Sequence, residues 1–400
     1  MPKVTRSSVH SSTPGRFRPG FVVLCVALLF LAGCGGRPGP GALAIATSNA
    51  PGTTEHRILI ATTREKDATP DTYFNGERSP TLNYASAVVS VPPNHVTGQI
   101  EWPETLPGDP EKSYTTRAFT YLDGAAGFRA ALKEEMAKRT PDHREVILFI
   151  HGYNTRFPEA LYRFAQITHD ADAPRIPVLF TWASRGTVTD YVYDNNSATA
   201  ARDGLERTLR EILDSGVSRV HIIAHSMGNW VLTETIRQVK LSNNPIPEDR
   251  IGAVILAAPD LDIDVFKSQL RRIGQRKTPF IVLVSRDDKA LKASSLIAGG
   301  KQRVGRYEDE QELANLGVIV IDLTELEGTD AIDHGKFTQV AAVAPRLRVA
   351  LQEAGLNTKP GDLNTHADTI GTAVGNTAKI AITLPVRILT APVQVLSGGQ

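Results

Sequence analysis

Six short apolar runs, separated by stretches of helical length, constrain the fold of this 400-residue chain more than any other feature. Near-continuous apolar runs are typical of strands buried on both faces of a parallel sheet. The stretches between them, such as 198–214 and 229–239, have the amphipathic pattern of helices. This alternation predicts an α/β fold with a mostly parallel, doubly wound sheet and helices on both faces. The runs are residues 145–150, 177–182, 219–224, 251–258, 279–285 and 317–323.

The chain before these runs predicts further elements of the same domain. Residues 57–62 and 84–91 have the composition of strands, and Pro92-Pro93 ends the second. The proline-rich residues 100–125 are expected to be irregular, and residues 127–139 to form a helix rich in Ala, Leu, Glu and Lys.

The N-terminal 33 residues have the pattern of an export signal. Four basic residues and no acidic one precede the apolar run 21–32, which is too short to span a bilayer comfortably. The run ends Leu31-Ala32-Gly33-Cys34, which resembles the lipobox of bacterial lipoproteins. That resemblance implies cleavage before Cys34, acylation of its thiol and a membrane-anchored protein of the bacterial cell envelope; an ordinary signal peptide or a short anchor is the alternative. Residues 34–56, rich in Gly, Pro and Ala at their start, are then expected to be a flexible tether.

Composition excludes several classes of protein. A net charge of +1 provides no basic stripe for nucleic acid, and removal of residues 1–33 would leave a mildly acidic chain. Two cysteines cannot form a disulfide scaffold or a four-cysteine zinc site. The sequence contains no phosphate-binding glycine loop and no H-E-x-x-H zinc pattern, so we expect neither a cofactor nor a metal.

The third run ends in Ala224-His225-Ser226-Met227-Gly228 and leads into a helix. A serine at a tight strand-to-helix turn, with small residues two positions before and after it, is typical of a nucleophile elbow. A serine-glycine turn without chemistry is the alternative. We expect Ser226 to be the nucleophile.

The general base and the acid should follow the serine, because the order in this type of site is Ser, acid, His. Of the two histidines beyond the last strand, His366 has no adjoining strand, so His334 is the expected base. Asp288, just past the run 279–285, is the preferred acid, with Asp287 as runner-up and Asp260 as an outlying candidate. Any of these aspartates could instead cap a helix.

An oxyanion hole requires two backbone N–H donors. One is expected from Met227, the residue after the nucleophile. The other is expected from the loop that follows run 145–150, with Tyr153 preferred and Asn154 next. His151 and His225 are expected to be structural.

The chain resembles the α/β-hydrolase superfamily at Ser226, at the loop after run 145–150, and around Asp288 and His334. More narrowly, it resembles a branch of bacterial esterase/lipase-like proteins of uncharacterised function. The resemblance covers about residues 57–350 and implies Ser226, Asp288 and His334 as the triad. Ala224 for the first glycine, and Gly335-Lys336 after the histidine, depart from the usual pattern. We therefore expect a hydrolase domain at 57–356 and a low-charge tail at 357–400, either docked or disordered. The motifs that carry the resemblance are FIHGYNTRF (149–157), LFTWAS (179–184), DYVYDNNSA (190–198), IIAHSMGNW (222–230), LAAPDLDIDVF (256–266), SRDDKAL (285–291) and DHGKF (333–337).

The resulting hypothesis is a lipid-anchored serine esterase that acts on a small-molecule or lipid ester. A non-catalytic envelope binding or scaffold protein, and an acyltransferase, are the alternatives. The stretch 190–196 (DYVYDNN) is expected either to line an acyl pocket or to pack under a loop.

Overall fold

The computed structural model describes residues 37–172, 174–274, 276–328 and 330–339, together with the backbone of residues 387–389. The predicted signal peptide 1–33, Cys34 and His366 lie outside the described residues, as does the predicted tail apart from residues 387–389. None of the described helices is long and apolar enough to cross a membrane.

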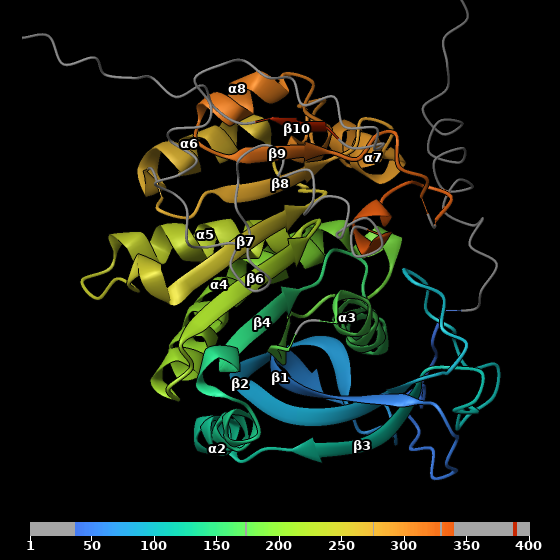
Figure 1. Cartoon of the computed structure of the whole chain (residues 1–400). Helices are drawn as coiled ribbons and strands as arrows, with labels where there is room; N and C mark the ends of the chain where they lie inside the picture. Colours follow the sequence, from blue (N-terminus) through green and yellow to red (C-terminus); the bar gives the residue numbers. More distant parts are fainter. Residues whose placement is uncertain (1–36, 173, 275, 329, 340–386, 390–400) are drawn as a thin grey trace, which may run out of the picture. The chain divides into compact units, whose positions relative to one another are not determined.

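A ten-stranded sheet runs through the domain (Figure 1). Its order is β10-β9-β8-β7-β6-β4-β5-β1-β2-β3, and the seven strands from β9 to β1 are parallel to one another. β2, β3 and β10 add to the two edges as antiparallel strands. The mostly parallel sheet predicted from the apolar runs is therefore confirmed. The strands are β1 (Thr54–Lys66), β2 (Phe74–Val91), β3 (Thr115–Tyr121), β4 (Glu145–Ile150), β5 (Ile176–Thr181), β6 (Arg219–His225), β7 (Ile251–Ala257), β8 (Phe280–Val284), β9 (Ile319–Asp322) and β10 (Arg387–Leu389).

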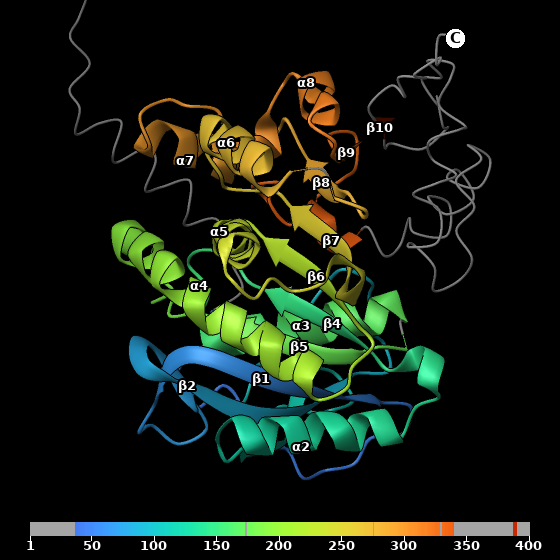
Figure 2. The same cartoon turned by 90° about the vertical axis from the view of Figure 1, so that its left-hand side faces the viewer.

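Helices cover both faces of the sheet (Figures 1 and 2). Buried side chains of α2, α4, α5 and α6 share one apolar core with the strands, whereas those of α3 belong to a second core on the other face. Each parallel strand thus buries its apolar residues on both sides, which explains why these strands read as near-continuous apolar runs. The helices are α2 (Gly124–Ala137), α3 (Phe157–Ala171), α4 (Tyr191–Asp214), α5 (Gly228–Leu241), α6 (Ile263–Ile273), α7 (Lys289–Ile297) and α8 (Glu310–Asn315).

The segment before β1 is not a flexible tether over its described part. Leu43 is fully buried in the core that contains α3, and its N–H donates to Asp71 O at 3.1 Å. The Ala46 N–H donates to Thr116 O at 2.9 Å, and the Arg117 guanidinium donates to Ala46 O at 2.7 Å. The prediction of a tether is therefore wrong for residues 37–53, because a few buried apolar residues and backbone bonds hold this glycine- and proline-rich stretch on the domain.

The expectation of an irregular segment at residues 100–125 also fails in part. Thr115–Tyr121 forms the edge strand β3, which pairs with β2 from Ser90↔Thr115 to Ala85↔Tyr121. The prolines precede this strand and do not interrupt it, so they do not block pairing. β1 and β2 are longer than predicted, and they pair with each other as one antiparallel hairpin. Helix α2 is offset by two to three residues from the predicted 127–139.

β4 and β6 lie side by side at the centre of the sheet, in a register that ends with Ile150 opposite Ala224. The loop after β4 and the turn after β6 consequently begin next to each other at the carboxyl edge of the sheet. Ligands of open α/β sheets bind at this edge.

Candidate active site

Ser226 occupies a strained turn between β6 and α5. Its φ is 51°, in the left-handed region that costs a non-glycine residue about 1–3 kcal/mol. The Ser226 N–H donates to Ala257 O at 3.0 Å, and Ser226 O accepts the Asn229 N–H at 3.1 Å and the Asn229 side-chain amide at 2.9 Å. These bonds to two neighbouring elements hold the serine in a conformation that it would not adopt alone, as a nucleophile elbow requires.

Small residues are required around the turn because backbones approach each other closely there. A Cβ on Gly228 would collide with His151 O and come within 2.8 Å of Ile150 O. A Cβ on Gly152 would lie 2.7 Å from the Cβ of Ser226. Ala224, in the position of the first glycine, is fully buried. Gly152 also shows that the loop after β4 lies directly against the serine.

His334 lies on the loop after β9, and one carboxylate shapes that loop. Asp330 accepts the N–H of Ile332 at 3.0 Å, of His334 at 3.1 Å and of Gly335 at 2.6 Å. Asp333, just before the histidine, has a left-handed φ of 59°. The His334 ring packs against the ring of His225, with centroids 4.6 Å apart, and so lies next to the residue that precedes the serine.

Asp288 is the carboxylate that contacts the histidine. His334 Nδ1 lies 2.7 Å from Asp288 Oδ2, and Asp288 Oδ1 accepts the Leu291 N–H at 2.9 Å as the cap of α7. The capping and orienting roles proposed as alternatives for this aspartate thus coexist on its two oxygens. Because Nδ1 is engaged, Nε2 is the ring nitrogen left to accept a proton.

The two alternative acids are engaged elsewhere. Asp287 accepts the Lys336 ammonium at 2.6 Å and the Ser285 hydroxyl. Asp260 accepts the Ser294 hydroxyl at 2.6 Å and lies 3.2 Å from Arg303 Nε. Neither carboxylate is paired with His334.

The charges around His334 favour its protonated form. Burial alone would lower the pKa of His334, but the charge and hydrogen bond of Asp288, with smaller contributions from Asp260 and Asp330, outweigh it and raise the pKa above 6.5. Burial and the neighbouring His334 hold the pKa of His225 well below that value. The pair therefore consists of one basic imidazole that can store a proton and one that stays neutral.

Three backbone N–H groups at the turn and on the loop that lies against it have no acceptor among the described residues, those of Met227, Gly152 and Tyr153. The alternative donor, the Asn154 N–H, is committed to Asp194 Oδ2 at 3.1 Å. The geometry thus leaves Met227 and Tyr153 open, as an oxyanion hole requires.

The sequence profile of a family described as alpha/beta hydrolase of unknown function (DUF900) matches residues 127–350, which is more than half of the chain. The protein belongs to this α/β-hydrolase family. The matched segment contains Ser226, Asp288 and His334. The fold class expected from the sequence is confirmed, and the protein is a hydrolase by family.

Two solved structures show a distant likeness to this hydrolase. A putative hydrolase from Agrobacterium vitis S4 is 13% identical, over 56% of this chain and 82% of its own, with a TM-score of 0.26. Esterase B from Lactobacillus rhamnosis, described with a C4-C4 SN3 tributyrin phosphonate, is 12% identical, over 67% of this chain and 91% of its own, with a TM-score of 0.28. No curated protein matches the chain.

Two buried charges that sequence reasoning missed support the loop after β4, which carries the expected oxyanion donor Tyr153 and is called the oxyanion loop below. Asp194 is fully buried and accepts the Ser184 hydroxyl at 2.5 Å in addition to the Asn154 N–H. Arg64 is 1% exposed and donates to Thr155 O and Ser184 O, both at 2.7 Å. Burial raises the pKa of Asp194 and lowers that of Arg64 to about 10. The only signal in the sequence was the DYVYDNN stretch.

Within the DYVYDNN stretch, Tyr191 packs against the loop after β4, which is one of the two arrangements expected for this stretch. The ring of Tyr191 lies 5.2 Å from that of Tyr153, edge to face, and its hydroxyl is 3.2 Å from Ser294 Oγ.

His151 is structural in its contacts, since its ring stacks on Trp182 and its Nε2 accepts the Trp182 N–H at 3.1 Å. Burial lowers the pKa of His151 to about 3, so it stays neutral.

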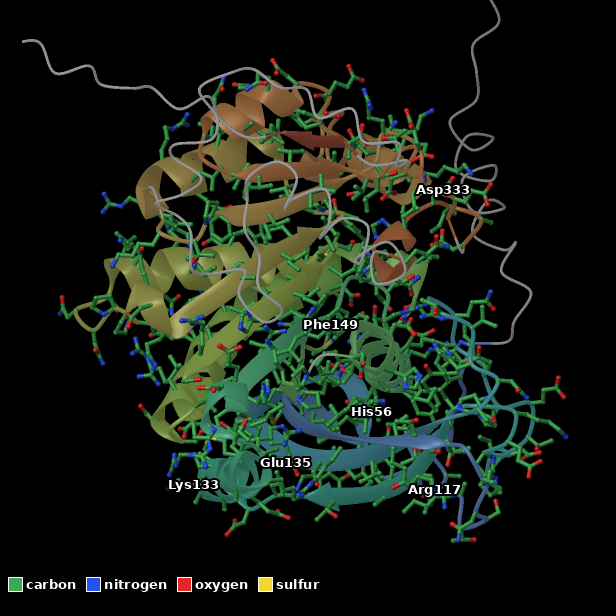
Figure 3. All side chains as sticks on the ribbon, viewed as in Figure 1. His56, Arg117, Lys133, Glu135, Phe149 and Asp333 are labelled. Carbon is green, nitrogen blue, oxygen red and sulfur yellow. The ribbon has the colours of Figure 1, made fainter. Side chains whose placement is uncertain are left out.

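A cleft of about 350 Å³ lies beside His334 and Gly152. Its size suits a small organic ligand. Figure 3 labels Phe149, on β4 in its wall, and Asp333, on the loop that carries His334. Among the described residues, no group of three or more His, Cys, Asp or Glu side chains could hold a metal ion. Apolar side chains that line the cleft are Ile100, Trp102, Phe149, Ala160, Ile332 and Phe337.

Proposed function

We propose that this hydrolase cleaves carboxylic esters through a Ser226–His334–Asp288 triad. The observation that carries the proposal is the combination of a left-handed serine turn with a histidine whose Nδ1 is 2.7 Å from a buried carboxylate. That arrangement fixes the imidazole in the tautomer that a general base needs.

In the proposed reaction, His334 Nε2 takes the proton of Ser226 Oγ as that oxygen attacks the ester carbonyl carbon. The N–H groups of Met227 and Tyr153 bind the oxyanion that forms. The C–O bond to the alcohol then breaks, and the His334 proton passes to the leaving oxygen. A water molecule, deprotonated by the same histidine, hydrolyses the acyl-enzyme and returns Ser226 to its starting state.

Labelling with a fluorophosphonate probe, followed by p-nitrophenyl butyrate hydrolysis, tests this proposal. The parent protein should label at Ser226 and turn over the ester, whereas Ser226→Ala should do neither. Ser48→Ala, which changes an exposed serine, is the matched control and should behave as the parent. Parent protein that is folded but not labelled would instead favour the scaffold alternative.

We also propose that Cys34 is acylated and anchors the enzyme in the bacterial envelope. The support is the Leu31-Ala32-Gly33-Cys34 sequence and the position of Arg37, only three residues later. Arg37 donates to Asn154 O at 2.6 Å and to Glu159 Oε1 at 2.7 Å, so it is held at the oxyanion loop. An acyl group on Cys34 would anchor the enzyme at the membrane surface.

Metabolic labelling with a radioactive fatty acid tests the anchor separately from the chemistry. The parent chain should incorporate label and sediment with membranes. Cys34→Ser should lose both properties and keep its activity on a water-soluble ester. Label retained by Cys34→Ser would contradict the proposal.

A further inference from the structure

We propose that Arg163 binds an anionic group of the substrate, so that the preferred substrates are esters carrying a carboxylate or phosphate. The inference rests on the proposed esterase function and adds the substrate class. Arg163 lies on α3 and lines the same cleft as His334 and Gly152.

One of the three guanidinium nitrogens of Arg163 is committed to the protein. Its Nη1 donates to Gly98 O at 3.1 Å and to Gln166 Oε1 at 2.8 Å. Nε and Nη2 have no acceptor among the described residues, and no described carboxylate lies within ion-pair distance of the group. Nε and Nη2 form one edge of the guanidinium, whose parallel N–H bonds match the two oxygens of a carboxylate or phosphate.

The other charged groups of the cleft are already satisfied. Glu159 accepts two hydrogen bonds from the Arg37 guanidinium. Asp330 accepts the three backbone N–H bonds of the His334 loop. Arg163 is therefore the charge in the described part of the cleft that keeps an open hydrogen-bonding edge.

The surroundings of Arg163 strengthen its attraction for an anion. Arg163 is partly buried, and burial lowers its pKa, although Tyr114, Asp330 and Asp170 partly compensate. Charge-assisted hydrogen bonds are stronger where water is excluded. The same cation also contributes to the lowered pKa of His225, which places its charge near the residue that precedes Ser226.

The lining of the cleft therefore combines apolar side chains with His334 and the Arg163 cation. Such a site would bind the apolar part of an ester on this lining, and would favour an ester that also offers an anion to Arg163. A neutral ester would leave the open guanidinium edge desolvated and unpaired, which reduces its binding.

A matched pair of substrates measures this discrimination. p-Nitrophenyl valerate is neutral, and the p-nitrophenyl monoester of glutarate has the same chain length with a terminal carboxylate. We expect the parent to favour the glutarate ester in kcat/KM, and Arg163→Gln to reduce that preference at least tenfold. Arg163→Lys should lose less of the preference, because lysine keeps the positive charge but lacks the two parallel N–H donors of the guanidinium. A lysophosphatidic acid and monoacylglycerol pair repeats the comparison with a phosphate.

Thr338→Val is the control for a purely structural role of Arg163. The Thr338 hydroxyl lies 3.4 Å from Gly98 O, the same carbonyl that Arg163 binds, but carries no charge. Thr338→Val should leave the substrate preference as in the parent. An equal loss of preference in Thr338→Val, or an unchanged preference in Arg163→Gln, would overturn the inference.

Calorimetric titration of the Ser226→Ala protein with the two esters separates this inference from the esterase proposal. The glutarate ester should bind at least tenfold more tightly to Ser226→Ala than to Ser226→Ala/Arg163→Gln, whether or not the parent turns over any ester. Equal affinities would refute the anion site. Inactivity of the parent would refute the esterase proposal alone. Should Arg163→Gln not fold, competition of glutarate against p-nitrophenyl valerate in the parent gives the answer, with no inhibition counting against the site.

Discussion

Asp288 accepts a hydrogen bond on each of its oxygens, from His334 Nδ1 at 2.7 Å on one and from the Leu291 N–H at 2.9 Å on the other. With only 1% of its surface exposed, it joins the start of α7 to the histidine loop. The residue that starts the helix is thus the residue that orients the proposed base.

Replacing Asp288 by asparagine separates these two functions. Asn caps helices as well as Asp does, so we expect the free energy of unfolding to change by less than about 1 kcal/mol. The charge that stabilises the imidazolium is lost, and kcat should fall by about 10³-fold or more. Ester hydrolysis and thermal unfolding of the same preparation give both values.

Asp287→Asn is the matched control for this substitution, because it changes the neighbouring carboxylate that does not contact His334. Its activity should stay within about tenfold of the parent at a temperature where it is folded. A greater loss of activity in Asp287→Asn than in Asp288→Asn would show that the acid is misassigned.

The pH dependence of catalysis should reflect the raised pKa of His334. Only the neutral imidazole accepts a proton, so kcat/KM should increase with pH through an apparent pKa above 6.5. The groups that face His334 are Asp288, Asp260, Asp330 and His225. Removing one negative charge, as in Asp260→Asn, favours the neutral ring and should move the ascending limb to lower pH. A limb that moves to higher pH, in profiles of kcat/KM measured between about pH 5 and 9, would contradict this assignment.

Much of the site could be anticipated from sequence because it depends on strand ends. Ser226, Asp288 and His334 each follow an apolar run, and the carboxyl ends of parallel strands meet at one edge. The sequence favoured Asp288 but left Asp287 open, since adjacent residues point in different directions and only the folded chain shows that Lys336 pairs with Asp287. The lysine that looked like a departure from the family pattern is that partner.

The hydrogen bonds that hold the oxyanion loop in place could not be predicted from sequence patterns. The bond between Asp194 and the Asn154 N–H joins residues 40 positions apart, and the bond between Arg37 and Asn154 joins residues 117 apart. Neither segment has a periodicity that predicts such a contact. Leu43, one apolar residue in a glycine- and proline-rich stretch, likewise gave no sign that it would be buried.

Asp194→Ala should lower kcat by about 10- to 100-fold through displacement of the oxyanion loop, with a smaller effect on KM. The substitution leaves the Asn154 N–H and the Ser184 hydroxyl without their acceptor. Asp190→Asn, four residues earlier on the same segment, is the matched control and should be close to the parent. Steady-state kinetics of the three proteins would disprove the supporting role if both substitutions had the same effect.

The ion pair between Lys336 and Asp287 should be asymmetric in its effect on stability. The Lys336 side chain is 3% exposed, whereas that of Asp287 is 41% exposed. Asp287→Ala therefore leaves a buried ammonium with Thr324 O as its remaining partner, and we expect a loss of about 2–4 kcal/mol in the free energy of unfolding. Lys336→Met leaves a carboxylate that water can reach, and should cost about 1 kcal/mol or less. Urea unfolding of both variants and of the double variant gives the coupling energy, and a larger loss in Lys336→Met than in Asp287→Ala would show that the buried ammonium is not the costly partner.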